Sequence, residues 1–180
     1  MRYSFDMAKI DNIYDAVDDF GLVTSAEAAE LGMSNVELVQ QARMGKLVRV
    51  ARGVYRMPVW PSQPAAPYAV AVRAAGEGAC LYGESVVALL GLVPIDPAKI
   101  WVAVQRRTRR NLGRGIRLVF APGIEPVWYE GVTCQPAAEA LIVAAMTMGH
   151  SRALEAAREA LRLGYVTAAE ADRVERELGE

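Results

Sequence analysis

The chain has 180 residues, of which 53% are apolar and 23% charged, a balance typical of a folded protein and not of a disordered one. No apolar run reaches the roughly 18 residues that a membrane span requires. The first ten residues, which include Asp6, lack the basic and then apolar pattern of a signal peptide, so we expect a cytoplasmic protein without membrane contact.

The formal net charge of −1 conceals blocks of opposite sign. Residues 6–30 hold seven acids and one lysine, whereas residues 34–56 hold four arginines and one lysine against a single glutamate. A third block, residues 106–117, holds six arginines and no acid. Two basic blocks in a nearly neutral chain indicate oriented surfaces suited to a polyanionic partner.

Apolar residues recur at helical spacing over residues 7–20, which predicts an amphipathic first helix with Gly21 at its C-terminal end. Thr24 or Ser25 is expected to cap a short second helix over residues 26–31. Glu27 stands three residues after Thr24, the spacing of a capping box.

The second helix is expected to end at Gly32, and Ser34 offers the cap of a third helix. That third helix should run to about Met44 and stop at Gly45. Two short helices joined by a glycine-containing turn form the helix-turn-helix pattern. Helical hairpins are common, so this pair alone is a weakly specific signal, and the segment that follows it strengthens the prediction.

A hairpin is predicted directly after the third helix. Residues 46–50 alternate as a strand, with Leu47 or Val48 facing inward, residues 51–53 form a tight turn, and residues 54–57 return. Its expected exposed positions are basic: Arg49, Arg52 and Arg56. A hairpin in this place is the wing of a winged helix-turn-helix, and one sign of charge along it suits DNA.

Four prolines, the first at Pro58 and the last at Pro67, then fall within ten residues. Because proline fixes φ and removes a backbone donor, this stretch predicts an extended linker. We therefore expect a winged domain over residues 1–57, a linker over 58–67 and a second domain over 68–180.

The second domain is predicted to be mixed α+β, with one small sheet and several helices. Helices are expected over residues 68–75, 84–90, 136–148, 151–163 and 167–178, and strands over residues 99–105, 116–121 and 127–134. Thr167 and Glu170 again have capping-box spacing. The fold class of the whole chain is therefore α+β, a winged helix-turn-helix followed by a mixed domain.

The arginine-rich block is the most conspicuous feature of the second domain. With Gly113 and Gly115 inside it, the block predicts a flexible loop between two strands. Guanidinium groups bind phosphates and carboxylates in a bidentate way, so DNA, an acidic protein or solvent alone could face it. The residues of this second basic surface are Arg106, Arg107, Arg109, Arg110, Arg114 and Arg117.

The chain offers little chemistry for a metal site. Cys80 and Cys134 stand alone in apolar surroundings, and the one histidine, His150, lies between two predicted helices, where capping of a helix C-terminus is the expected role. Zinc needs about four nitrogen or sulfur ligands. We expect buried thiols, no metal and no cofactor.

Signs of catalysis are also missing. Ser85 lies in no Gly-x-Ser-x-Gly elbow, and no phosphate-binding loop occurs. Glu125 and Glu130, at the margins of the predicted strands, form none of the paired carboxylates that nucleases use to hold metal. We expect a protein that is not an enzyme and has no catalytic residue.

The order of these parts resembles the AbiEi-like antitoxin family. The most specific motif is the wing, Gly45-x-Leu47-x-Arg49-Val50-x-Arg52-Gly53-Val54-Tyr55. Looser similarity continues through Gly83-Glu84-Ser85-x-x-Ala88-x-x-Gly91-Leu92, the strand Ile100-x-Val102-x-Val104 and the closing helices. The resemblance implies a type IV antitoxin that represses its own operon and counters a nucleotidyltransferase-like toxin, without a stable complex being necessary.

The chain departs from the family pattern in two places. Many relatives carry Arg-Thr-x-x-Asp where this chain has Glu139, Ala140 and Val143, so a stand-alone regulator is an alternative to an antitoxin. Gln41 stands where relatives usually keep an apolar residue in the third helix. A further alternative is a protein-interaction module that docks an acidic partner through the loop from Arg106 to Arg117.

For DNA binding, the third helix should lie in the major groove, with Asn35, Gln40 and Arg43 facing bases, although its many apolar residues leave the exposed face open. The full predicted DNA-binding set is Ser34, Asn35, Gln40, Arg43, Lys46, Arg49, Arg52 and Arg56. The expected partner is the double-stranded DNA of the chain's own operator. A monomer or weak homodimer should pair on an inverted repeat there.

Overall fold

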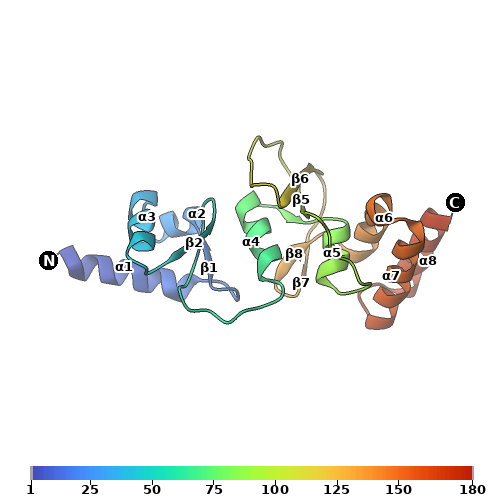
Figure 1. Cartoon of the computed structure of the whole chain (residues 1–180), viewed down its shortest axis with the longest axis horizontal. Coiled ribbons are helices and arrows are strands. Elements are labelled where there is room, and N and C mark those ends of the chain that lie inside the picture. The colour runs from blue at the N-terminus through green and yellow to red at the C-terminus, as the bar shows by residue number, and fades with distance from the viewer. Residues whose placement is uncertain (1, 180) are drawn as a thin grey trace. The chain divides into compact units, whose positions relative to one another are not determined.

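The computed structural model describes the backbone of residues 2–179 and the side chains of residues 9–179 (Figure 1). It divides into two compact units, Met1–Ala74 and Ala75–Glu180. The division falls at the end of helix α4 (Ala66–Ala75), beyond the proline-rich segment 58–67. Helices and small sheets occur in both units, so the α+β fold class predicted from the sequence is confirmed.

The first unit begins with a winged helix-turn-helix. Its elements are α1 (Arg2–Ala16), β1 (Leu22–Thr24), α2 (Ser25–Glu30), α3 (Asn35–Arg43), β2 (Val48–Ala51) and β3 (Val54–Arg56). The three strands form an antiparallel sheet in the order β1-β3-β2 (Figure 1). Hairpin β2–β3 is the wing, and it follows α3 directly.

Side-chain caps determine where the two short helices begin. Thr24 Oγ1 accepts the N–H of Glu27 at 3.3 Å, and Glu27 Oε2 accepts the N–H of Thr24 at 2.8 Å. Ser34 and Glu37 repeat the same exchange at the start of α3. The predicted capping box at Thr24 is confirmed, and a second one is present at Ser34.

The segment between α1 and α2 differs from the prediction. Helix α1 ends at Ala16, so Gly21 is not its C-terminal cap. Asp18 Oδ1 instead accepts the N–H groups of Phe20 and Leu22, both at 2.9 Å, which turns the chain into β1. Local sequence does not predict this strand, because a three-residue edge strand carries almost no periodicity of its own.

The core of the winged domain draws on all three helices, on strands β1 and β3 and on the segments that precede α3 and β2. Its fully or nearly fully buried members are Ile10, Ile13, Val23, Ala28, Met33, Leu38, Leu47 and Tyr55. Of the two inward candidates at the start of the wing, Leu47 is buried and Val48 is exposed. The wing and α3 therefore share one core, which holds them in a defined orientation.

The proline-rich segment is attached to the first unit at two points. Trp60 Nε1 and Gln63 Nε2 both donate to the carbonyl oxygen of Asp19, at 3.1 and 2.7 Å. Gly21, whose φ is +71°, lies beneath the indole ring, where a Cβ atom would come within 2.4 Å of Trp60 Cδ2. The segment thus packs on the turn between α1 and β1.

The second unit contains a five-stranded mixed sheet in the order β6-β5-β4-β8-β7. Its elements are β4 (Cys80–Leu81), α5 (Glu84–Leu89), β5 (Ile100–Val104), β6 (Ile116–Phe120), β7 (Val127–Tyr129), β8 (Val132–Cys134), α6 (Ala137–Met148), α7 (His150–Leu163) and α8 (Ala168–Gly179). Strands β5 and β6 are parallel neighbours, and β6 forms one edge of the sheet.

Two expectations about the second unit need correction, and one strand is additional to those predicted. The single strand predicted over residues 127–134 is a hairpin, because Glu130 and Gly131 adopt positive φ values of 50° and 76° and reverse the chain. His150 is the first residue of α7, so it does not cap a helix C-terminus. The two-residue strand β4 was not predicted.

Cys80 and Cys134 are both buried and free, as expected. Burial raises the pKa of the Cys80 thiol to about 11. Burial, with a smaller contribution from Cys80, raises the pKa of Cys134 to about 12. Both thiols therefore stay protonated near neutral pH, which keeps them unreactive.

Candidate nucleic-acid interface

Helix α3 has one buried and one exposed face. Leu38 and Gln41 are buried, and Ala42 packs against the core. The exposed side chains on the other face are Asn35, Val36, Val39, Gln40 and Arg43. They recur at intervals of three and four residues, so they share the outer face. The structure thus settles which face of α3 is outward, and the three predicted base-contacting residues, Asn35, Gln40 and Arg43, all lie on it.

The N-terminus of α3 is held by a charged network. Lys9 Nζ lies 2.7 Å from Glu37 Oε1, and Glu37 Oε2 accepts the N–H of Ser34 at 2.7 Å. These hydrogen bonds, the one from Lys9 foremost, lower the pKa of Glu37 to about 2. Ser34 Oγ accepts the N–H of Glu37, so its hydroxyl oxygen serves as the helix cap. Ser34 therefore positions α3.

The wing presents two exposed arginines. Arg49 lies on β2 and Arg52 in the turn that connects β2 to β3. Gly53, with φ +72°, completes that turn, and its carbonyl oxygen accepts the N–H of Ser25 at 2.9 Å. The tip of the wing is therefore anchored to the start of α2, which fixes where Arg52 can reach.

Two of the predicted basic residues are less accessible than expected. Arg56 lies on the central strand β3, where it is half-buried and its Nε has no hydrogen-bond partner. The alternation of the hairpin had suggested an exposed position, which is wrong because β1 pairs with the other side of β3 and crowds it. Lys46 is half-buried, and its carbonyl oxygen accepts the hydroxyl of Tyr14 at 2.7 Å.

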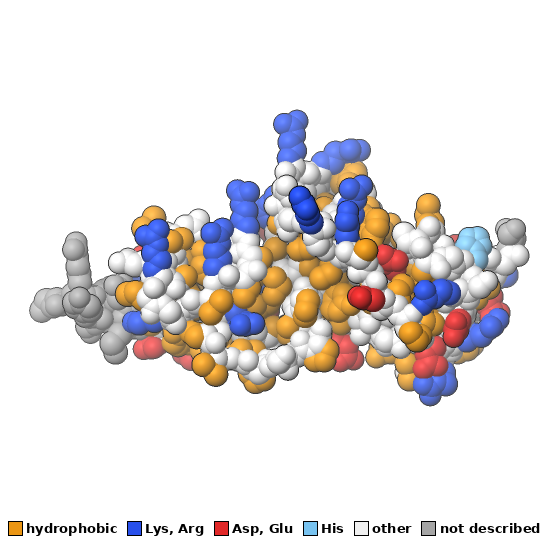
Figure 2. Space-filling view, in the orientation of Figure 1, with side chains coloured by type: hydrophobic (Ala, Val, Ile, Leu, Met, Phe, Trp, Pro, Cys, Tyr) orange, Lys and Arg blue, Asp and Glu red, His pale blue; other side chains and the backbone are white. Residues whose placement is uncertain are grey.

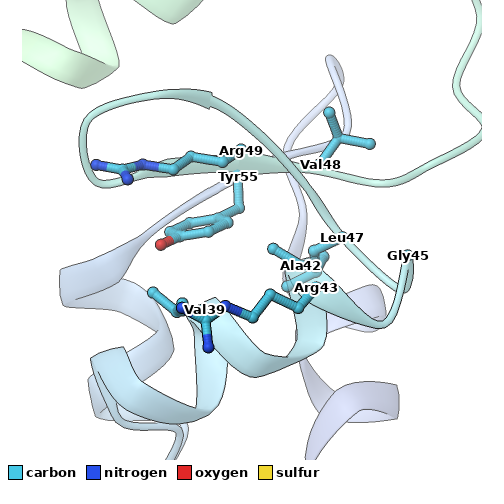
Figure 3. Close-up of a pocket in the computed structure, with 8 residues that line it drawn as sticks. All are labelled: Val39, Ala42, Arg43, Gly45, Leu47, Val48, Arg49 and Tyr55. Atoms are coloured by element: carbon cyan, nitrogen blue, oxygen red, sulfur yellow. The ribbon is translucent and has the colours of Figure 1, made fainter.

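A shallow open groove separates α3 from the wing (Figure 3). Its lining is mostly apolar, with arginines from both sides: Val39, Ala42, Arg43, Gly45, Leu47, Val48, Arg49 and Tyr55. In Figure 3 the ring of Tyr55 extends from β3 toward α3, and Arg49 lies on the same face of the hairpin. The helix and the wing thus form one continuous surface.

Basic side chains project over this surface. In the first unit, Figure 2 shows Lys and Arg side chains standing out over the region of α3 and β2. The exposed cations among the described residues 34–56 are Arg43, Arg49 and Arg52. An exposed helix flanked by arginines matches the electrostatic footprint of a protein that binds a phosphate backbone.

The second basic surface lies on the crossover between β5 and β6. Since these strands are parallel, residues 105–115 must return along the length of the sheet. Arg107 stacks on Phe120, with its guanidinium carbon 4.7 Å from the ring centroid, and Arg110 Nη1 donates to the carbonyl oxygen of Ala75 at 3.3 Å. The other four arginines of the block are also exposed: Arg106, Arg109, Arg114 and Arg117.

Among residues whose side chains the structure describes, no three His, Cys, Asp or Glu side chains come together in a group that could hold a metal ion. Within the described helices, none combines the length and the apolar character needed to cross a membrane. The surface of α3 and the wing is therefore the candidate site that the geometry supports best.

The surface of α3 and the wing lies in the part of the chain that is similar to a known protein family. Residues 15–58 match the model of a family described as AbiEi antitoxin transcriptional regulators. This confirms the resemblance over the segment that contains the helix-turn-helix and the wing, which is less than half of the chain. No curated protein matches the chain. The matched segment includes every predicted DNA-binding residue, from Ser34 to Arg56.

Proposed function

We propose that this chain is a sequence-specific DNA-binding repressor of its own operon and the antitoxin that counters a nucleotidyltransferase-like toxin. The observation that carries the proposal is the outward face of α3. Asn35, Gln40 and Arg43 lie there together, next to a basic wing, within the segment that matches AbiEi antitoxin transcriptional regulators.

In this proposal α3 lies in the major groove of the operator. Asn35 or Gln40 can pair with adenine, and Arg43 with guanine, each contributing about 1–3 kcal/mol of discrimination. Arg49 and Arg52 on the wing neutralise phosphates or reach the adjacent minor groove, which adds affinity that falls with salt but little specificity. Lys46 and Arg56, which are half-buried, contribute through the local potential more than through direct contacts.

The operator is expected to be an inverted repeat. One small winged domain with three polar base-contacting side chains has too few contacts for tight selective binding. Two copies, monomers or a weak homodimer in solution, would pair on two half-sites about one helical turn apart.

The test is a gel-shift titration against DNA from directly upstream of the chain's own reading frame. An unrelated duplex of equal length serves as control, at two salt concentrations. Selective binding that weakens with salt is the expected result. Equal, weak binding to both duplexes would remove the basis for a regulator and reduce the winged domain to a scaffold.

The antitoxin activity has a separate test. An adjacent reading frame with nucleotidyltransferase carboxylates is the expected source of the toxin, and co-expression with the chain should restore growth. The double variant Arg43→Ala/Arg52→Ala, expressed from an unrelated promoter, separates operator binding from toxin neutralisation, because its two substitutions are expected to remove DNA binding alone. Growth rescue by this variant would show that neutralisation does not need repression. Failure of the unaltered chain to rescue would leave a stand-alone regulator.

A second candidate function rests on the exposed arginines of the β5–β6 crossover. Arg106, Arg109 and Arg114 on the crossover, with Arg117 at the start of β6, could dock an acidic protein or add phosphate contacts. Replacing Arg106, Arg109 and Arg114 by glutamate discriminates between these roles, since a DNA surface would lose affinity for every duplex alike. A protein-docking surface would leave DNA affinity unchanged and abolish growth rescue.

A further inference from the structure

Helix α3 exposes apolar side chains that neither pack in the core of the winged domain nor take part in the N-terminal cap of the helix. Val36 is 77% exposed and Val39 is 37% exposed, three residues apart on the outward face. Among the described residues of the first unit, six large apolar side chains are exposed, and five of them lie between Leu31 and Val48: Leu31, Val36, Val39, Met44 and Val48. Scattered exposed valines are ordinary, but this set is concentrated on the proposed site.

Folding gives no reason for a valine at position 36. Its side chain lies outside the core of the winged domain, to which α3 contributes Leu38 and Ala42. A β-branched residue also stabilises a helix less than alanine does. The methyl groups of Val36, on the first turn of the helix next to Asn35, are therefore accessible to a group outside the protein.

The charges around the valines restrict what that contact can be. Arg43 lies seven residues after Val36 on the same face, and Arg43 and Arg49 flank the groove to which Val39 contributes. A surface that combines arginines with exposed valines suits a polyanion that carries apolar groups at regular intervals along its length. In duplex DNA the major groove has one such group, the 5-methyl of thymine, which apolar side chains contact.

We propose that Val36 and Val39 contact thymine 5-methyl groups in the operator and make the chain selective for A·T pairs under the start of α3. This inference rests on the proposed function, since it requires α3 to lie in the major groove. Gln40 and Asn35, on the same face, can pair with the adenine of an A·T pair, so polar and apolar contacts specify the same base pair.

The decisive probe is DNA without thymine methyl groups. The duplex upstream of the chain's reading frame is amplified once with dTTP and once with dUTP, so the two probes differ only by the 5-methyl of each thymine. Gel shifts with the full chain, in excess unlabelled unrelated duplex, should show at least about fourfold weaker binding to the uracil probe, the effect of losing one buried methyl.

A matched pair of variants assigns the effect to the valines. Val36→Ala, and the double variant with Val39→Ala, should bind the thymine probe more weakly and lose most of the preference for it over uracil. Val59→Ala is the control, because Val59 is 89% exposed in the same unit but outside α3 and the wing. It should keep both the affinity and the preference, and thermal unfolding should show all variants folded.

Two results would overturn the inference about the valines without contradicting the proposed DNA-binding function. One is equal affinity of the unaltered chain for both probes, and the other is an undiminished preference for thymine in the double valine variant. If the unaltered chain does not bind the thymine probe selectively, the proposed function is contradicted. The inference about Val36 and Val39 is then contradicted as well, because it rests on that function.

Discussion

Arg73 on α4 and Glu27 on α2 form a bidentate ion pair: Nη1 donates to Oε1 at 2.9 Å and Nη2 to Oε2 at 2.7 Å. The same Oε2 also accepts from the backbone and the hydroxyl of Thr24. Burial by itself raises the pKa of Glu27, but the bonds from Thr24 and the charge and bonds of Arg73 outweigh it and leave the pKa lowered. One carboxylate thus caps α2 and holds α4 to the winged domain.

Arg73→Ala should lower the free energy of unfolding by about 1 kcal/mol, because the pair is bidentate but its glutamate is partly exposed and screened by solvent. Urea unfolding of the full chain, followed by circular dichroism, measures the change. Arg158→Ala is the matched control, since Arg158 lies on the surface 3.6 Å from Glu175. Equal stability of the two variants would show that the contact between α4 and α2 contributes nothing.

Glu37 should make the stability of the winged domain depend on pH. Its folded-state pKa of about 2 lies below the ordinary value of 4.5, so its contribution is complete above pH 4.5 and is lost as the pH falls toward 2. Glu37→Gln keeps the capping geometry and removes the charge. Its melting temperature should be lower than that of the unaltered chain at neutral pH, and the difference should shrink through this acid range. A constant difference would contradict the prediction.

Gln41→Leu should stabilise the chain by about 1–2 kcal/mol, because a buried acceptor without a partner carries a desolvation penalty. Gln41 is 2% exposed on the inner face of α3, and its Oε1 has no hydrogen-bond partner. Thermal unfolding measures the gain. The control is Gln40→Leu on the outer face, which should leave stability nearly unchanged, and DNA affinity should fall only in this control.

Gly21→Ala should destabilise the first unit more than Gly45→Ala does. Both glycines adopt a positive φ, +71° and +72°, so both alanines bear the same backbone strain. A Cβ atom at Gly21 would also lie 2.4 Å from the ring of Trp60, whereas nothing lies within 4 Å at Gly45. The difference between the two variants in chemical denaturation isolates the effect of that clash, and equal losses would refute the packing of Trp60 on this turn.

Arg52→Ala and Gln40→Ala should weaken DNA binding in different ways. Loss of the wing arginine should lower affinity for all sequences and reduce the slope of log K against log salt by about one. Loss of Gln40 should cost about 1–3 kcal/mol at one base position and leave the slope unchanged. A panel of operator variants titrated at several salt concentrations distinguishes them. Binding by Gln40→Ala that is reduced equally on every variant would count against the assigned face of α3.

Much of the first unit follows from local sequence. Capping residues at Thr24 and Ser34 and stop signals at Gly32 and Gly45 act within a few residues, so the bounds of α2 and α3 could be predicted closely. The wing was also visible, because a tight turn with Gly53 and one sign of charge needs no distant partner. The same local signals led to the resemblance that the family match over residues 15–58 confirms.

Features that depend on a partner distant in sequence could not be predicted in this way. Strand β1 exists because Leu22–Thr24 pairs with β3, about 30 residues later, and Arg56 is half-buried for the same reason. The outward face of α3 remained open in the sequence because apolar residues occupy both of its sides. Only packing of Leu38 and Gln41 against the core decides that Val36, Gln40 and Arg43 face outward, since burial is a property of the whole fold and not of any local pattern.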